Sequence, residues 1–132
     1  MPRRYVIDTH ACVFLLAGPR KLGTHARRAL ERVERGDDEG WIPAAVAAEV
    51  VLLHELGRIG IGLPHLREAV ESVPGLRFLP LDLDQLDQFA SLTSIRDAFD
   101  RLIVSAARSL KADLITRDEA LARSGLVRVV WA

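Results

Sequence analysis

Short runs of β-branched and aromatic residues alternate with helical patterns along the whole chain, and this alternation restricts the fold more than any other feature. The runs typical of strands are YVID (5–8), WIP (41–43), LRFLPL (76–81), ADLIT (112–116) and LVRVVW (126–131). Between them the apolar residues follow helical spacing. Strands that alternate with helices predict an α/β fold with a central, mostly parallel sheet.

The helical segments have recognisable ends. Gly18 and Pro19 terminate a helix over THACVFLLAG (9–18), and Thr24 suits the N-cap of a helix that runs to Arg35. Asp82 or Asp84 caps the helix that contains QLDQFASL (85–92). Further helices are predicted over 44–56, 64–73, 96–110 and 119–123.

Composition indicates one compact domain over residues 1–132. The chain is 49% hydrophobic, and its 18 basic and 18 acidic residues cancel, so a polyanion partner needs a local patch of positive charge. Cys12 is the only cysteine, which excludes an internal disulfide and favours a reducing compartment. The apolar runs are too short to span a bilayer. We therefore expect a cytoplasmic protein without a membrane anchor.

Acidic residues fall where the predicted strands end. Asp8 closes the first strand, and Asp118 lies two residues beyond ADLIT. Because the carboxyl ends of parallel strands meet at one edge of the sheet, both carboxylates are expected there. Asp97 and Asp100, in the first turns of the helix that precedes ADLIT, can reach the same edge.

Glu49 is the unusual acid, since it interrupts the apolar helix PAAVAAEVVLL. A buried acid needs a partner, and no lysine or arginine lies within one helical turn; solvent exposure is the alternative. The other acids also have structural explanations: Asp97 and Asp118 can cap helices, and Asp100 can pair with a neighbouring arginine. Four or five carboxylates without matching lysines nevertheless indicate a cation, and oxygen ligands favour Mg²⁺ or Mn²⁺.

Four segments in this order and spacing resemble the PIN-domain ribonucleases, and most closely the VapC-type toxins of toxin–antitoxin pairs: VIDTHACVFLLAG, AAEV, RDAFDRLIVSAA and LITRDEAL. The resemblance covers essentially the whole chain and implies a three-layer α/β/α fold. It places the family's catalytic, metal-binding acids on Asp8, Glu49, Asp100 and Asp118. Asp97, Thr9 and Thr116 match accessory positions. Ala98 departs from the family's usual proline, and AAEV lacks the serine and tryptophan often found before the glutamate.

The resemblance implies a Mg²⁺- or Mn²⁺-dependent endoribonuclease that is inhibited by a cognate antitoxin and commonly forms a homodimer. Apolar faces over 12–16 and 46–56 would serve such protein contacts, although ordinary core packing explains them equally well. Candidate phosphate contacts beside the acids are Arg96, Arg101 and Arg117. The alternatives are a catalytically inactive PIN-like binding module and a phospho-acceptor signalling domain. A phospho-acceptor domain requires a pair of acids near the first strand and a lysine late in the chain. This sequence has no acidic pair before Asp8, and its last lysine, Lys111, precedes ADLIT.

Overall fold

Five parallel strands form a single sheet in the order β3-β2-β1-β4-β5 in a computed structural model that describes residues 1–132. The strands are β1 (Arg4–Ile7), β2 (Glu39–Pro43), β3 (Leu76–Leu79), β4 (Asp113–Ile115) and β5 (Val129–Val130). The predicted α/β architecture is confirmed, and the sheet is entirely parallel. The last strand is shorter than the run LVRVVW suggests, since only two of its residues pair with β4.

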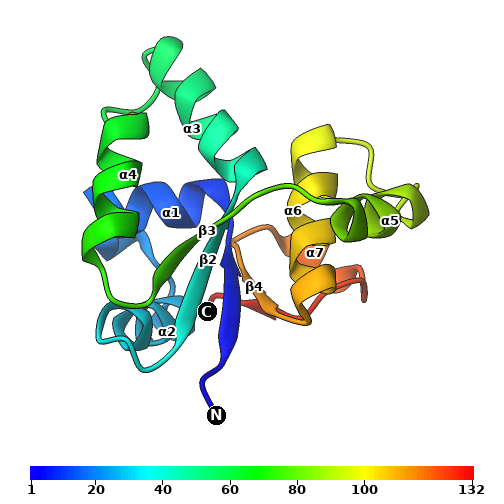
Figure 1. Ribbon diagram of the computed structural model, residues 1–132, viewed down its shortest axis with the longest axis horizontal. Helices are drawn as coiled ribbons and strands as arrows, with labels where there is room; N and C mark the ends of the chain where they lie inside the picture. The colour runs from blue at the N-terminus through cyan, green and yellow to red at the C-terminus, as the bar shows by residue number, and fades with distance from the viewer.

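Helices cover both sides of the sheet, so the molecule has three layers (Figure 1). The side with α1, α2 and α4 faces away from the side with α5 and α6, and α3 contacts helices of both layers. The helices are α1 (Thr9–Ala17), α2 (Thr24–Glu34), α3 (Ala44–Glu55), α4 (Leu63–Ser72), α5 (Leu83–Ser91), α6 (Ala98–Leu110) and α7 (Glu119–Arg123), with one 3-10 turn over Pro19–Lys21. None of these helices combines the length and the apolar character that crossing a membrane requires.

The core lies between the sheet and its helices. The central strands supply side chains with no or almost no solvent exposure: Val6, Ile7, Ile42, Leu114 and Ile115. Strands buried on both faces are expected to be continuously apolar, which explains why these runs do not alternate with polar residues.

Gly23, and not Thr24, occupies the N-cap position of α2, so the predicted cap is wrong by one residue. The reason is tertiary, since the amide of Ala26 in the first turn donates to the carbonyl of Trp131 at 3.0 Å. A Cβ at position 23 would lie only 2.3 Å from that carbonyl oxygen. A backbone carbonyl from the other end of the chain therefore replaces the side-chain cap.

Candidate active site

The carboxyl ends of β1 and β4 lie side by side at the centre of the sheet. β2 and then β3 follow on one side of β1, whereas β4 and then β5 follow on its other side. The sheet is therefore extended in opposite directions from the gap between β1 and β4. Asp8 directly follows β1, and its amide donates to the carbonyl of Ile115 at 3.0 Å. Open parallel sheets bind ligands at such a point.

A hollow of about 250 Å³ opens at this edge and has no apolar residue in its lining. We call it the acid pocket; it is lined by Asp8, Thr9, His10, Glu49, Asp100, Thr116, Arg117 and Asp118. All four acids that the sequence singled out as metal ligands therefore meet in one pocket. They come from four different elements, at the starts of α1, α6 and α7 and in the middle of α3.

Three acids begin helices at this edge. Asp8 caps α1 by accepting from the Thr9 amide at 2.7 Å, and Asp118 caps α7 by accepting from the Leu121 amide at 3.0 Å. Asp97 caps α6 by accepting from the Asp100 amide at 3.0 Å. The capping roles predicted for Asp97 and Asp118 are confirmed, whereas the sequence did not predict that Asp8 also caps a helix. Three helix N-termini, each with partial positive charge, thus lie close to the acids.

Two buried threonines hold carboxylates in place. The Thr116 hydroxyl donates to Asp8 Oδ2 at 2.5 Å and accepts from the Asp118 amide at 3.1 Å, so it connects the ends of β1 and β4. The Thr9 hydroxyl donates to Glu49 Oε1 at 2.6 Å. Glu49 is half-buried with this partner, so it does not simply face solvent. The threonines therefore fix the orientation of acids that lie far apart in the sequence.

Repulsion among the acids is concentrated on Asp100. Partial burial, followed by the negative charges of Asp97, Asp8, Asp118 and Glu49, raises the pKa of Asp100 to about 6. None of the ion pairs in the structure involves an acid of the pocket. The pocket therefore carries an excess of negative charge, since its lining holds four acids and one arginine, Arg117.

The donor set fits a hard divalent cation, because carboxylate and hydroxyl oxygens are the ligands that Mg²⁺ and Mn²⁺ prefer. In the structure no three histidine, cysteine, aspartate or glutamate side chains are close enough together to form a metal site as they stand. Three of the four carboxylates are instead hydrogen-bonded to Thr9, Thr116 and helix amides.

The three candidate phosphate contacts occupy different surroundings. Arg117 lines the acid pocket, and its guanidinium lies 5.1 Å from the centre of the Phe14 ring. Arg101 does not line it: its Nε donates to the Phe89 carbonyl at 2.8 Å, and its guanidinium stacks on the Phe89 ring. Arg96 is exposed and lies outside the lining. Arg101 is thus a structural contact between α6 and α5, although the partner is not a neighbouring acid.

His10 is the pocket residue that the sequence did not mark as part of the site. It is exposed at the second position of α1, and its ring lies 6.3 Å from that of Phe14. Its position next to Asp8 and Thr9 was the only available signal. Cys12, two residues further along, is fully buried, and burial together with the charge of Asp8 raises the pKa of its thiol to about 12. Cys12 is therefore a core residue.

A family profile for the PIN domain matches residues 5–125, which is nearly the whole chain and includes all four acids of the pocket. The chain belongs to the PIN-domain family. PIN domains are nucleases, so the family places this protein among enzymes that hydrolyse nucleic acids. Comparison with curated protein sequences gives no significant match.

Solved structures of the same fold include chains from toxin–antitoxin complexes. The chain is similar to one from VapBC2 of Rickettsia felis bound to a promoter DNA fragment, with 17% identity, a TM-score of 0.71 and coverage of 98% and 99% of the two chains. A chain of DNA-bound VapBC from Salmonella typhimurium has 15% identity and a TM-score of 0.69, with coverage of 98% of this chain and 97% of the other. A chain of FitAcB from Neisseria gonorrhoeae has 21% identity and a TM-score of 0.64, with coverage of 95% of each chain. At such identities these structures support the PIN fold itself.

Proposed function

We propose that this PIN domain is a metal-dependent endoribonuclease and the toxin of a toxin–antitoxin pair. The observation that carries the proposal is the convergence of Asp8, Glu49, Asp100 and Asp118 on one polar pocket, where none of the four takes part in an ion pair. Such a charge distribution is costly in the absence of a cation. The similarity to chains from VapBC and FitAcB structures supports the assignment as a toxin.

The proposed roles follow from position. Asp8, Asp100 and Asp118 would hold Mg²⁺ or Mn²⁺, and Glu49 would hold a second ion or orient the attacking water. A divalent ion supplies Lewis acidity: it stabilises charge on phosphate oxygens and lowers the pKa of water. The protein's own contribution is preorganisation, since Thr116 and Thr9 keep Asp8 and Glu49 oriented before substrate binds.

Arg117 is the arginine that we propose for the scissile phosphate. It lines the acid pocket and makes no ion pair, so its guanidinium is available for an anionic substrate. A planar guanidinium binds two phosphate oxygens at once. Arg101 is engaged with Phe89 and Arg96 lies outside the pocket, so we assign neither of them this role.

The test is RNA cleavage by protein purified free of antitoxin, with Mg²⁺, with Mn²⁺ and with EDTA. We expect metal-dependent cleavage that is lost in Asp100→Asn and kept in Asp87→Asn, which makes the same change on the exposed surface of α5. Equal cleavage by Asp100→Asn would point to a contaminating nuclease. Absence of cleavage by the wild type would favour an inactive binding module, and labelling by a small phosphodonor would favour a signalling domain.

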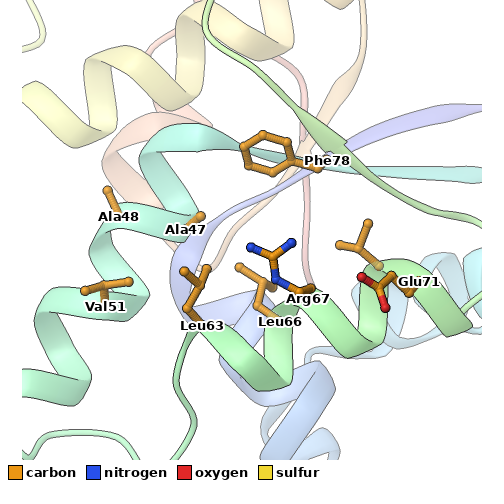
Figure 2. A pocket seen from close by; sticks show the side chains of 9 residues that line it. Ala47, Ala48, Val51, Leu63, Leu66, Arg67, Glu71 and Phe78 are labelled. Carbon is orange, nitrogen blue, oxygen red and sulfur yellow. The ribbon is translucent and has the colours of Figure 1, made fainter.

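An apolar groove beside α3 is the place that we propose for the antitoxin. It encloses about 480 Å³, and Figure 2 shows α3, α4 and β3 contributing its side chains. The lining is Ala47, Ala48, Val51, Leu63, Leu66, Arg67, Val70, Glu71 and Phe78. The predicted face over 46–56 is in part available for protein contacts, because α3 contributes to this groove. The face over 12–16 is largely core, since Cys12, Val13 and Phe14 are buried.

A further inference from the structure

A second hollow, of about 640 Å³, adjoins the acid pocket and shares Thr116 and Asp118 with it. Its lining comes from the start of β1, one face of α2, the two ends of β4, the start of α7, and β5 with the residues that follow it. We propose that this hollow, the cationic groove, binds the sugar–phosphate backbone of single-stranded RNA beside the cleavage site. The inference rests on the proposed ribonuclease function and adds a path for the substrate.

Basic side chains are concentrated in the cationic groove although the whole chain has no net charge. On α2, Arg28 and Arg32 lie on the same helix face as His25, because residues three, four and seven apart in a helix share a side. The His25 ring is hydrogen-bonded to the backbone oxygen of Ala132, so the arginines supply the positive charge. Arg3 reaches the groove from the first residues of the chain, and Arg128 from the residue before β5. Local positive charge of this kind is what a chain of zero net charge needs to hold a polyanion.

Two of these guanidinium groups make no ion pair and no hydrogen bond in the protein, although the charge of Arg3 helps to lower the pKa of nearby Asp38. The side chains of Arg3 and Arg28 take part in none of the ion pairs, and no side-chain hydrogen bond involves either of them. Arg32 is committed to buried Asp38 at 2.8 Å, and Arg128 lies 3.8 Å from Asp113. Arg3 and Arg28 are therefore free to form bidentate contacts with phosphates.

The acids in the same lining do not neutralise these two arginines. Asp113 faces Arg128, and Glu119 lies 3.6 Å from Arg123. Asp118 belongs to the acid pocket, where the proposed cation would compensate its charge. The cationic groove therefore places free arginines directly next to the negative acid pocket. A strand cut in the acid pocket could have the phosphates on one side of the cleaved bond bound in the cationic groove.

Trp131 provides an aromatic surface between the two sites. It lines the cationic groove, is half-buried, and lies 6.4 Å from the Phe14 ring, over which Arg117 of the acid pocket is placed. Its backbone is fixed by the bond from the Ala26 amide. Aromatic rings beside basic side chains are typical of single-strand binding sites, because every base can stack on them.

The experiment measures binding of a fluorescently labelled oligouridine to the Asp100→Asn protein, which keeps the groove but is expected not to cleave. Arg3→Ala and Arg28→Ala are added to it singly and together, with Arg58→Ala, an exposed arginine in the α3–α4 link, as the matched control. We expect the double variant to bind about tenfold or more weakly, since charged hydrogen bonds to phosphate are lost. Arg28→Lys, which keeps the charge but not the bidentate geometry, should bind more tightly than Arg28→Ala and more weakly than the protein with Arg28 intact.

Salt dependence separates phosphate contacts from structural damage. The binding constant falls as salt rises, and between about 50 and 200 mM salt each phosphate contact on a single strand contributes about −0.7 to the slope of log K against log salt. The slope of the double variant should therefore be less negative by about 1.4. An affinity and slope equal to those of Arg58→Ala would overturn the inference and leave the groove to an acidic protein segment. Wild-type protein that neither binds nor cleaves RNA would instead overturn the proposed function itself.

Discussion

At the scale of single residues, Asp100 is where function and stability conflict. It is half-buried among Asp97, Asp8, Asp118 and Glu49, and burial and these charges raise its pKa to about 6. A carboxylate is needed for metal binding, yet the ionised form is the one that the folded protein disfavours. We expect active sites to keep such residues because their chemistry requires them, at a cost in stability.

Stability should therefore fall as Asp100 ionises. Its pKa is higher in the folded protein than in the unfolded chain, so the folded state binds the proton more tightly, and the free energy of unfolding decreases as pH rises from about 4 to about 6. Asp100→Asn removes this repulsion. Because Asp100 is partly exposed, we expect only about 1 kcal/mol of added stability at pH 7 without metal.

Chemical denaturation at pH 4 and pH 7 in EDTA checks this prediction. The gain from Asp100→Asn should be present at pH 7 and absent at pH 4, where the wild-type carboxyl is already protonated in the folded protein. Asp87→Asn, on the exposed surface of α5, serves as the control and should show no gain at either pH. Destabilisation by Asp100→Asn at pH 7 would contradict the repulsion that we infer.

At the scale of elements, one buried acid joins α2 to the edge where β1 and β2 begin. Asp38 is 2% exposed, lies just before β2, and accepts from the Arg3 amide at 3.0 Å and from Arg32 Nε at 2.8 Å. Burial opposes its charge, but these two hydrogen bonds, together with the positive charges of Arg32 and Arg3, outweigh burial and keep the pKa of Asp38 below its usual value. The segment 36–38 between α2 and β2 is therefore an anchored turn.

Asp38→Ala should lower the free energy of unfolding by about 1–3 kcal/mol, because the amide of Arg3 loses its acceptor and Arg32 loses its partner. The neighbouring Asp37→Ala is the matched control. Asp37 pairs with Arg35 at 3.1 Å on the exposed surface, where such pairs contribute about 0–1 kcal/mol. Urea denaturation of both variants measures the difference, and equal effects would show that Asp38 is no anchor.

At the scale of the whole molecule, exposed leucines gather around the start of α5. Leu81, Leu83 and Leu86 are 46%, 78% and 39% exposed. This patch is distinct from the groove proposed for the antitoxin, to which α5 contributes no residue. We propose it as part of a homodimer interface, because exposed apolar clusters on soluble domains are typical of protein contacts.

Leu83→Glu should weaken the dimer about tenfold or more, since burial of a leucine stabilises an interface by about 1.5–3 kcal/mol. The side chain is so exposed that folding should be unaffected. Sedimentation velocity over a range of protein concentrations measures the effect, and Ala122→Glu, at an exposed position of α7, is the control. A wild type that stays monomeric at every concentration would contradict the prediction.

Much of the architecture follows from local sequence patterns. Strand and helix runs depend mainly on neighbouring residues, and so the elements and the α/β class could be predicted. The placement of Asp8 and Asp118 also follows, because parallel strands bring all their carboxyl ends to one edge whatever their order. The family resemblance added Glu49, which no local pattern singled out as a ligand.

Only the tertiary structure decided how these side chains are held. The bond from Thr116 to Asp8 joins residues 108 positions apart, and the bond from Thr9 to Glu49 joins residues 40 apart. Arg101 contacts Phe89 of α5, and Arg28 faces a groove in which no acid pairs with it. In both cases the neighbours of the arginine come from other elements of the chain. Strand order and helix packing determine such neighbours, and they depend on the burial of the whole chain, which no short stretch of sequence contains.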